Sequence, residues 1–314
     1  MTRPLRIVFM GTPDFAVPAL QALIHGPDQV VAAVCQPDRP RGRGRKLTPP
    51  PVKVCAEAAG IPVLQPASIR SEEFHQAVRE LRPDLIVVAA YGKILPGSLL
   101  NLPPMGTINV HGSLLPKYRG AAPIQWAVIN GETETGVTIM QMDEGMDTGD
   151  ILLPVKTPIS EEDTAGTLFA RLARLGGEAL VQAIALLKEG RLTPVPQDDA
   201  LATEAPMLTK EQGRLDWSRD ARSLHCLIRG LDPWPSAYTF LGGKRFRLFR
   251  PAVVAGEVSQ PPGTICRADR EGLLIATGRD HLLVREIQPE GKKRMDVQAC
   301  LCGGRIHAGD RFDA

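Results

Sequence analysis

The sequence predicts an α/β fold followed by a second, smaller β domain. Over the first 190 residues, short apolar runs typical of buried strands alternate with amphipathic helical patterns. After residue 207 the pattern changes to short strands separated by turn residues, as in a small β-barrel. A chain of 314 residues also exceeds what one hydrophobic core usually serves. We therefore expect a Rossmann-like, mostly parallel sheet in residues 1–190, a linker in residues 191–207 and a second domain in residues 208–314.

The first domain opens with a strand–helix–strand unit, the building block of a parallel sheet. Residues 5–10 and residues 30–34 have strand patterns, and residues 15–24 between them carry one apolar helical face. The further elements that we expect here are a helix at 52–59, a strand at 62–64, a helix at 72–81, and strands at 85–90, around Asn109 and at 137–142. A long amphipathic helix over residues 164–189 closes this domain.

The second domain is expected to combine one helix with several short strands. The helix covers residues 221–228, and residues 238–249 form a hairpin that turns at Gly242 and Gly243. Shorter strands are expected at residues 263–267, 272–276 and 281–287.

The overall composition is that of an ordinary globular protein with nearly balanced charge, +2 at neutral pH. Aromatic residues are scarce, which argues against binding by extensive base stacking. No apolar run is long enough to span a bilayer, and the first residues show no signal-peptide pattern. The six cysteines are scattered, and Cys300 and Cys302 have no second pair with which to bind zinc. We expect a cytoplasmic protein with reduced thiols.

Asn109 and His111 form the centre of the predicted site. They lie two residues apart at the end of an apolar, β-branched run, so on a strand both side chains point to the same face. Histidine is the side chain best suited to moving a proton near neutral pH, and a carboxamide can donate to a developing oxyanion. A purely structural role for His111 is the alternative interpretation.

An acidic loop at residues 143–150 follows the next expected strand and could complete this site. A carboxylate beside His111 would favour the imidazolium and fix the orientation of the ring. Asp147 is our candidate, although the sequence leaves open Asp143, Glu144 and Asp150. Asp150 could instead bond to the backbone of the turn.

The residues around Asn109 and His111 also limit the type of reaction, because two common catalytic features are missing from the sequence. No serine or cysteine lies in an evident nucleophile turn, and the cluster supplies few metal ligands. The residues therefore favour direct transfer of an acyl or one-carbon group to the acceptor, without a covalent enzyme intermediate and without a metal.

Two other strand ends are expected to lie beside this site. Residues 11–14 form a glycine turn that opens a helix, but the phosphate-binding glycine motifs are missing, so a tight turn near another ligand is favoured over a dinucleotide site. Tyr91 and Gly92 follow the strand at residues 85–90. Ligands bind at the carboxyl ends of the strands in such sheets, so we expect one cleft there.

A basic loop over residues 36–51 interrupts the alternation of strands and helices. Its cations are Arg39, Arg41, Arg43, Arg45 and Lys46, and Asp38 is the one acid among them. The glycines and prolines of this loop are expected to preclude regular structure. Such a loop suits a phosphate backbone and would become ordered on binding, although a solvated surface loop is the simpler alternative. The second domain is also basic, at Lys244, Arg245, Arg247, Arg250, Lys292, Lys293 and Arg294.

Residues 109–116 (NVHGSLLP) and 142–150 (MDEGMDTGD) resemble motifs of the formyltransferases that use 10-formyltetrahydrofolate. The resemblance is closest to the branch of this family that acts on methionyl-tRNA, and it is carried by residues 9–18, 36–47 and 118–124, by Trp217 and by residues 232–235 (DPWP). It covers essentially the whole chain and is weakest at residues 299–305, to which we assign no role.

The resemblance implies roles that spacing alone does not. It makes Asn109, His111 and Asp147 the catalytic residues, and 10-formyltetrahydrofolate the co-substrate. It assigns folate contacts to Ser113, Leu114, Leu115 and Pro116, and it makes residues 36–51 the loop that meets the acceptor stem of initiator methionyl-tRNA. It also implies that the second domain is an oligonucleotide-binding-type (OB-like) barrel whose hairpin, with Lys244, Arg245 and Arg247, helps to hold the tRNA. A monomer is the family expectation.

Other functions remain open at this stage. Related enzymes formylate an amino-sugar nucleotide or glycinamide ribonucleotide, and a folate-dependent hydrolase or dehydrogenase component would need no amine acceptor. An RNA-binding module on an inactive scaffold is the non-enzymatic alternative. The basic loop and the basic second domain favour the tRNA acceptor over an amino-sugar nucleotide or glycinamide ribonucleotide.

Overall fold

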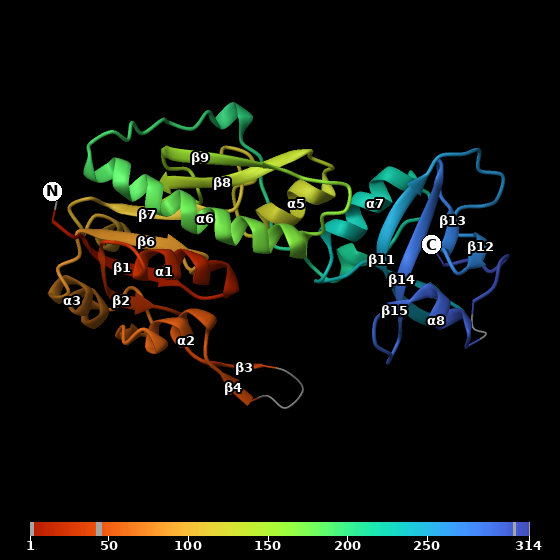
Figure 1. Ribbon diagram of the computed structural model, residues 1–314, viewed down its shortest axis with the longest axis horizontal. Coiled ribbons are helices and arrows are strands. Elements are labelled where there is room, and N and C mark those ends of the chain that lie inside the picture. The colour runs from red at the N-terminus through yellow and green to blue at the C-terminus, as the bar shows by residue number, and fades with distance from the viewer. Residues whose placement is uncertain (1–2, 42–45, 304–305, 314) are drawn as a thin grey trace. The chain divides into compact units, whose positions relative to one another are not determined.

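The computed structural model describes residues 3–41, 46–303 and 306–313 (Figure 1). Arg43 and Arg45, two of the predicted tRNA contacts, lie outside the described residues. The chain forms two compact units, and each is described by itself. The first unit comprises residues 1–121, 134–158 and 169–205, and the second comprises residues 122–133, 159–168 and 206–314.

The first unit is built on a seven-stranded sheet in the order β5-β2-β1-β6-β7-β8-β9. Its strands are β1 (Arg6–Gly11), β2 (Gln29–Val34), β5 (Val63–Leu64), β6 (Leu85–Ala89), β7 (Thr107–His111), β8 (Glu134–Gln141) and β9 (Ile151–Pro158). The first five are parallel, whereas β8 pairs antiparallel with β7 and β9 antiparallel with β8. The predicted open, mostly parallel sheet is confirmed.

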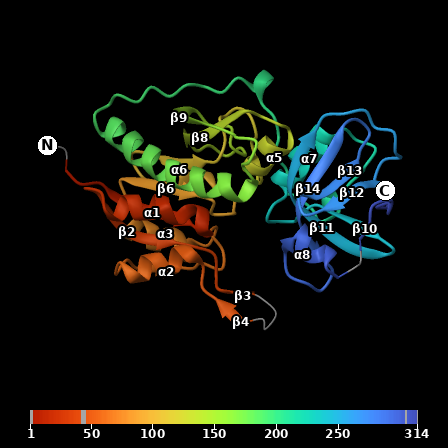
Figure 2. The ribbon, with the colours of Figure 1, turned by 45° about the vertical axis from the view of Figure 1, so that its right-hand side comes forward.

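Helices cover both faces of this sheet (Figures 1 and 2). They are η1 (Asp14–Ala16), α1 (Val17–Ile24), α2 (Pro51–Ala58), α3 (Glu72–Glu80), α4 (Gly97–Leu100) and α6 (Ala165–Lys188), with a short 3₁₀ turn η2 (Asp199–Leu201). On one face, Gly176 of α6 lies against Val110 of β7, where an added β-carbon would come within 2.7 Å of the valine. On the other face, side chains of β1 and β6 pack with α3 and α4 in one core cluster.

This arrangement decides which way the site residues point. Val88 of β6 belongs to the cluster with α3 and α4, and it is the register partner of Asn109 on β7. Paired residues on adjacent strands share a face, and so do residues two apart on one strand. Asn109 and His111 therefore continue the row of Val88, whereas Val110 points to α6.

The predicted loop at residues 36–51 is partly regular, which corrects our expectation. Residues on either side of its undescribed part form β3 (Arg39–Arg41) and β4 (Lys46–Thr48), paired antiparallel with Pro40 opposite Leu47. Both strands of a two-stranded ribbon are edge strands, where proline is tolerated because its missing N–H can face away from the partner. The prolines therefore did not preclude pairing.

The second unit contains an antiparallel sheet in the order β10-β11-β14-β13-β12, with β15 beside β14. The strands are β10 (Tyr238–Leu241), β11 (Lys244–Val254), β12 (Ile265–Asp269), β13 (Gly272–Ala276), β14 (His281–Pro289) and β15 (Met295–Asp296). Gly242 and Gly243 form the predicted hairpin turn, with φ of +56° and +74°. Residues 312 and 313 bind both β10 and the segment before β12. Asp313 N–H donates to the Phe240 carbonyl (2.8 Å), and Phe312 N–H donates to the Gly263 carbonyl (2.9 Å).

Four helical segments belong to the second unit: α5 (Pro123–Ile129), η3 (Glu211–Gly213), α7 (Ala221–Gly230) and α8 (Val297–Leu301). Asp220 caps α7 by accepting from Ser223 N–H at 2.9 Å. In the core, the Trp217 ring stacks on Phe312 with centroids 5.7 Å apart, and its indole N–H donates to Thr239. The antiparallel β domain expected from the sequence is confirmed, and α5, which precedes β8 in the chain, was not expected there.

Candidate active site

The candidate site lies at the carboxyl end of β7, where Asn109 and His111 are both buried. His111 Nε2 lies 3.0 Å from the backbone carbonyl of Tyr118. A carbonyl can only accept, so Nε2 carries a proton and donates. The other ring nitrogen, Nδ1, lies 3.5 Å from Oδ2 of Asp147. The ring therefore stands between two acceptors, and an imidazolium has a proton for each.

Asp147 is the acid that approaches His111, which settles a choice the sequence left open. Asp143 is turned back on its own loop, where it accepts from Gly145 N–H (3.1 Å) and Thr148 Oγ1 (2.8 Å). Asp147 adopts φ +57°, and its carboxylate accepts from Gly120 N–H at 2.9 Å. The same oxygen, Oδ2, thus faces a backbone donor and His111.

Asn109 is the uncommitted polar group of the three. It is 8% exposed, and its carboxamide takes part in no hydrogen bond with the residues that the structure describes. A polar group at a nearly buried position normally has a partner. Its free N–H groups are therefore available to an oxygen of a bound molecule.

The four predicted folate residues form the turn after β7. Ser113 is buried and its hydroxyl donates to the Lys117 carbonyl at 2.6 Å, while Leu115 N–H donates to Thr138 Oγ1 at 3.1 Å. Leu114 and Pro116 are half-buried. Two polar groups of this segment thus hold the turn itself, and its half-buried apolar side chains remain accessible.

The neighbouring strand ends are tied together by side chains. Thr12, after β1, donates to the Tyr91 carbonyl after β6 (3.2 Å) and accepts from Gln36 N–H after β2 (3.3 Å). Burial raises the pKa of Tyr91 to about 12, so its hydroxyl stays protonated. Gly11 allows the close approach of β1 to β6, because an added β-carbon would lie 2.9 Å from the Ala89 carbonyl. The ends of β1, β2 and β6 thus meet at the carboxyl edge of the sheet, the edge at which β7, paired in parallel with β6, also ends.

Asp38 anchors the base of the β3–β4 ribbon. Its carboxylate accepts from Gln65 Nε2 at 2.7 Å and from Lys53 Nζ at 3.1 Å. These hydrogen bonds, first that of Gln65 and then that of Lys53, lower the pKa of Asp38. The one acid of the basic segment is therefore engaged by Lys53 of α2 and by Gln65, which follows β5, and no ion pair joins it to the exposed Arg39.

The other predicted tRNA contacts lie on the β10–β11 hairpin of the second unit. Lys244 and Arg245 are exposed, and Arg247 is half-buried beside Gln288. Arg245 lies over the ring of Tyr238 at 5.9 Å. Phe246 and Leu248 alternate with these cations and fill the core. The strand therefore presents its charges on the outer face.

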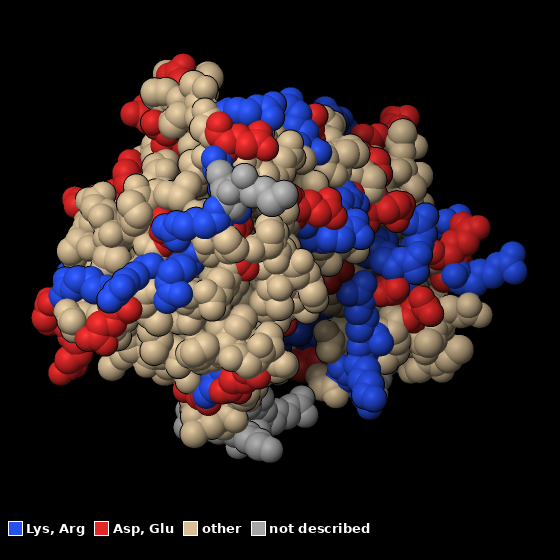
Figure 3. All heavy atoms as spheres, turned by 60° about the vertical axis from the view of Figure 1, so that its left-hand side comes forward, with Lys and Arg blue, Asp and Glu red and all other residues tan. Residues whose placement is uncertain are grey.

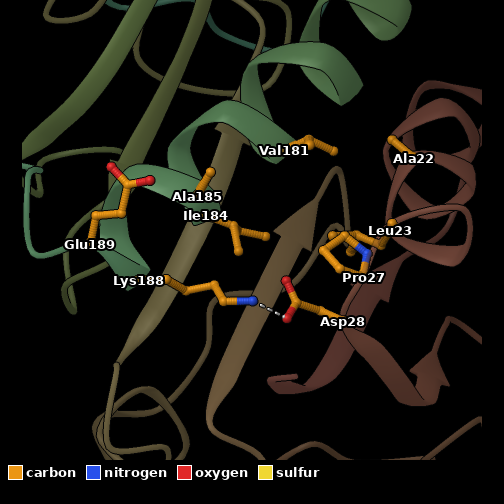
Figure 4. Close-up of a pocket in the computed structure, with 10 residues that line it drawn as sticks. Ala22, Leu23, Pro27, Asp28, Val181, Ile184, Ala185, Lys188 and Glu189 are labelled. Carbon is orange, nitrogen blue, oxygen red and sulfur yellow. Dashed lines mark hydrogen bonds and ion pairs between the residues drawn. The ribbon is translucent and has the colours of Figure 1, made fainter. Parts of the chain in front are cut away.

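Two cavities of the described residues lie away from His111: one of about 530 Å³, lined by Arg79, Asp84 and Pro104 among others, and a smaller one at the ends of α1 and α6. Basic and acidic side chains are interspersed on the face drawn in Figure 3. A cavity of about 210 Å³ lies between the ends of α1 and α6, where Lys188 pairs with Asp28 at 2.6 Å (Figure 4). Asp28 precedes β2, at the amino edge of the sheet, opposite to His111. The volume is below that of typical ligand pockets, roughly 300 Å³ or more.

Within the described ranges, no group of three or more His, Cys, Asp or Glu side chains could hold a metal ion, and no helix is long and apolar enough to cross a membrane.

The sequence reasoning missed Arg119 and Gln197. Gln197 lies in the segment expected to be a linker, yet its Nε2 donates to the backbone carbonyls of Asp147 (2.8 Å) and Gly149 (2.7 Å). Arg119 donates to Gln197 Oε1 through Nε (3.0 Å) and Nη2 (2.9 Å). No local pattern connects positions so far apart in the chain, and the half-buried Gln197 stands among exposed neighbours.

Comparison with known proteins identifies the family. Residues 5–184 match the profile described as formyl transferase, and residues 207–305 match that of the formyl transferase C-terminal domain. The chain belongs to the formyl transferase family. The formyltransferase motifs that suggested the resemblance thus lie within the matched ranges.

Named relatives of this formyl transferase cover nearly its whole length. It is 64% identical over 306 residues to the methionyl-tRNA formyltransferase of Desulfotalea psychrophila (strain LSv54 / DSM 12343), covering 98% of this chain and 95% of the relative. It is 52% identical over 308 residues to the methionyl-tRNA formyltransferase of Geobacter sulfurreducens (strain ATCC 51573 / DSM 12127 / PCA), covering 98% and 96%.

Solved structures share the fold at lower identity. WlaRD, a sugar 3N-formyl transferase, is similar with a TM-score of 0.68 at 16% identity, over 92% of this chain and 99% of that one. HypX from Aquifex aeolicus in complex with tetrahydrofolic acid has a TM-score of 0.63 at 18% identity, over 98% of this chain. This chain spans about half the length of HypX, 48%.

Proposed function

We propose that this formyl transferase moves the formyl group of 10-formyltetrahydrofolate to the free α-amino group of initiator methionyl-tRNA, which gives N-formylmethionyl-tRNA for translation initiation. The supporting observation is the 64% identity to a methionyl-tRNA formyltransferase over nearly the full length of both chains. The match includes both units, and so both the candidate active site and the basic hairpin of the second unit.

The chemical step is a direct attack by the amine. The α-amino nitrogen attacks the formyl carbon, and the carbonyl electron pair moves to oxygen to give a tetrahedral oxyanion. The free carboxamide of Asn109 donates to this oxyanion. Loss of a proton from the attacking nitrogen and cleavage of the bond from the formyl carbon to N10 of the folate then release tetrahydrofolate, whose N10 takes up a proton.

His111 and Asp147 act as a pair in this scheme. Nε2 of His111 is occupied by the Tyr118 carbonyl and Nδ1 faces Asp147, so the imidazolium supplies a positive charge beside the oxyanion. Asp147 stabilises that charge and assists in removing the proton of the amine. The scheme involves no covalent bond to the enzyme and no metal ion.

The folate is assigned to the turn at Ser113, Leu114, Leu115 and Pro116. The Ser113 hydroxyl and the Leu115 N–H already have internal partners, so these two residues shape the turn. The half-buried side chains of Leu114 and Pro116 supply the apolar contact.

The tRNA is held by two sets of cations that contact phosphates and carry no sequence information. They are Arg39, Arg41, Arg43, Arg45 and Lys46 of the first domain, and Lys244, Arg245 and Arg247 of the second. We take residues 1–190 as the catalytic domain, 191–207 as the connection and 208–314 as the tRNA-binding domain. The enzyme works as a cytoplasmic monomer.

The test is formylation by the purified protein with 10-formyltetrahydrofolate and charged initiator or elongator methionyl-tRNA. Transfer to initiator methionyl-tRNA, much faster than to the elongator form, is the expected result. Parallel reactions offer an amino-sugar nucleotide, glycinamide ribonucleotide or water as the acceptor. Faster transfer to any of these would overturn the proposal, and so would tight tRNA binding without transfer.

A further inference from the structure

The loop between β8 and β9 holds Asp147 in a conformation that side chains rarely adopt. Its φ of +57° lies in the left-handed region, which favours glycine and which aspartate tolerates less well. Nearby, Gly149 approaches the Gln141 carbonyl so closely that an added β-carbon would lie 2.0 Å from it. The position of the Asp147 carboxylate thus depends on a tightly folded loop, whose unfavourable backbone conformation needs stabilising contacts.

Gln197 holds this loop from outside. The two hydrogens of its side-chain NH₂ group go to two carbonyls, those of Asp147 and Gly149, at 2.8 and 2.7 Å. The first carbonyl belongs to Asp147 itself and the second lies two residues further on, so the contact fixes the backbone from which the carboxylate projects. The carboxamide does not touch the carboxylate itself.

Arg119 fixes the orientation of Gln197. Its Nε and Nη2 both donate to Oε1, and because arginine can only donate, the NH₂ group must point to the loop. The residues beside Arg119 contact the catalytic pair: the Tyr118 carbonyl accepts from His111, and Gly120 N–H donates to Asp147. One short segment thus reaches both partners of the pair directly and the Asp147 loop through Gln197.

Residues 203–205 join residues 118–120 to the chain segment 197–205, which begins with Gln197. Arg119 N–H donates to the Thr203 carbonyl at 2.8 Å, and Ala205 N–H donates to the Arg119 carbonyl at 2.7 Å. Gly120, with φ +118°, leaves room for the Ala205 carbonyl, which would lie 2.9 Å from an added β-carbon. Residues 197–205 are therefore bound at both ends, through the side chain of Gln197 and through the backbone beside Arg119.

We propose that Gln197, oriented by Arg119, is a positioning residue that keeps the Asp147 carboxylate on His111 during formyl transfer. This inference rests on the proposed function. Its physical basis is that a catalytic group displaced by about 1 Å can cost about 100-fold in rate.

The test uses Gln197→Glu, which keeps the size of the side chain and its acceptor for Arg119 but removes both donors. We expect kcat for formylation of initiator methionyl-tRNA to fall about 10- to 100-fold, with KM for tRNA and for folate changed less than about 3-fold. In Arg119→Lys, which keeps the positive charge but cannot make two hydrogen bonds to Gln197 Oε1, kcat should fall less than in Gln197→Glu. Asp199→Asn is the matched control, because Asp199 contacts Arg119 with a side chain that is 85% exposed.

A double-mutant cycle separates positioning from general damage. If Gln197 acts through Asp147, Gln197→Glu should have almost no further effect on kcat in an Asp147→Asn background. Equal losses in both backgrounds would overturn the inference, as would an unchanged kcat in the single variant.

The failures of the two proposals can be told apart. A wild-type protein that does not formylate methionyl-tRNA contradicts the proposed function. In that case a crystal structure of Gln197→Glu still decides the inference: an Asp147 carboxylate moved away from His111 supports it, and an unmoved one overturns it.

Discussion

Asn109 is the residue whose role in the site depends least on its neighbours. Its carboxamide has no hydrogen-bond partner among the described residues, so its removal leaves no other group unpaired. If Asn109 is the oxyanion donor that we propose, Asn109→Ala should fold normally and lose about 100- to 1000-fold in kcat, the usual cost of removing one such donor. Steady-state formylation with thermal unfolding as the control checks this. A variant within about 3-fold of wild type would contradict the assigned role.

His225 on α7 predicts a pH dependence of stability. It is buried, and its Nδ1 has no hydrogen bond but lies 3.8 Å from Glu161 Oε2. Burial, followed by the positive charge of Arg229, lowers its pKa to about 4 although Glu161 opposes this. An unfolded histidine has a pKa near about 6.5, so between these values the unfolded chain binds more protons. The stabilisation is therefore present above pH ~6.5 and lost as the pH falls towards ~4, by about 3 kcal/mol.

This loss can be measured by urea unfolding at several pH values in that window. Other groups contribute their own pH dependence, so the comparison is with His225→Gln, which cannot titrate. The difference in unfolding free energy between the two proteins should change in favour of the variant as the pH falls. Parallel curves from pH 7 to pH 4 would show that His225 is not protonated on unfolding.

At the scale of elements, α5 and α7 pack so closely that Gly230 is required. A β-carbon there would lie 2.4 Å from Ile129 Cγ1 and 3.0 Å from the Gln125 carbonyl. Gly230→Ala should lower the unfolding free energy by about 1–3 kcal/mol, because a packed helix must move. Gly256→Ala is the control, since its nearest neighbour would be 3.6 Å away. Equal denaturation midpoints of the two variants would contradict the prediction.

The same contact shows why some elements escaped sequence analysis. Strand β6 and helix α6 were predictable because the apolar pattern of each lies within one continuous stretch of sequence. Their bounds agree with the expected ones to within one residue. In contrast, α5 is seven residues long, and its partner Gly230 lies about a hundred positions away. The edge strand β9 carries Pro154 and Pro158, which count against a strand when its position in the sheet is not known.

Some residues of the candidate site could likewise be predicted from the sequence, and others could not. Asn109 and His111 were predictable because the period of a strand is two, and that face is confirmed by the pairing with Val88. The approach of Asp147 rather than Asp143 was not, since it depends on a left-handed backbone and on Gly120. Gln197 was hidden in a segment whose prolines and acids are typical of a linker.

At the scale of the molecule, a net charge of +2 leaves tRNA binding to local clusters of cations. We propose the β3–β4 ribbon as one of these clusters, since Arg39 is exposed and Asp38 is engaged by Gln65 and Lys53. The Kd for initiator tRNA should therefore rise steeply between roughly 50 and 200 mM salt, and Arg39→Ala should reduce the log–log slope by about 1. Fluorescence anisotropy measures both. Arg79→Ala on α3 is the matched control, since α3 leads to the amino end of β6, away from the site. Equal slopes for the two variants would show that Arg39 contacts no phosphate.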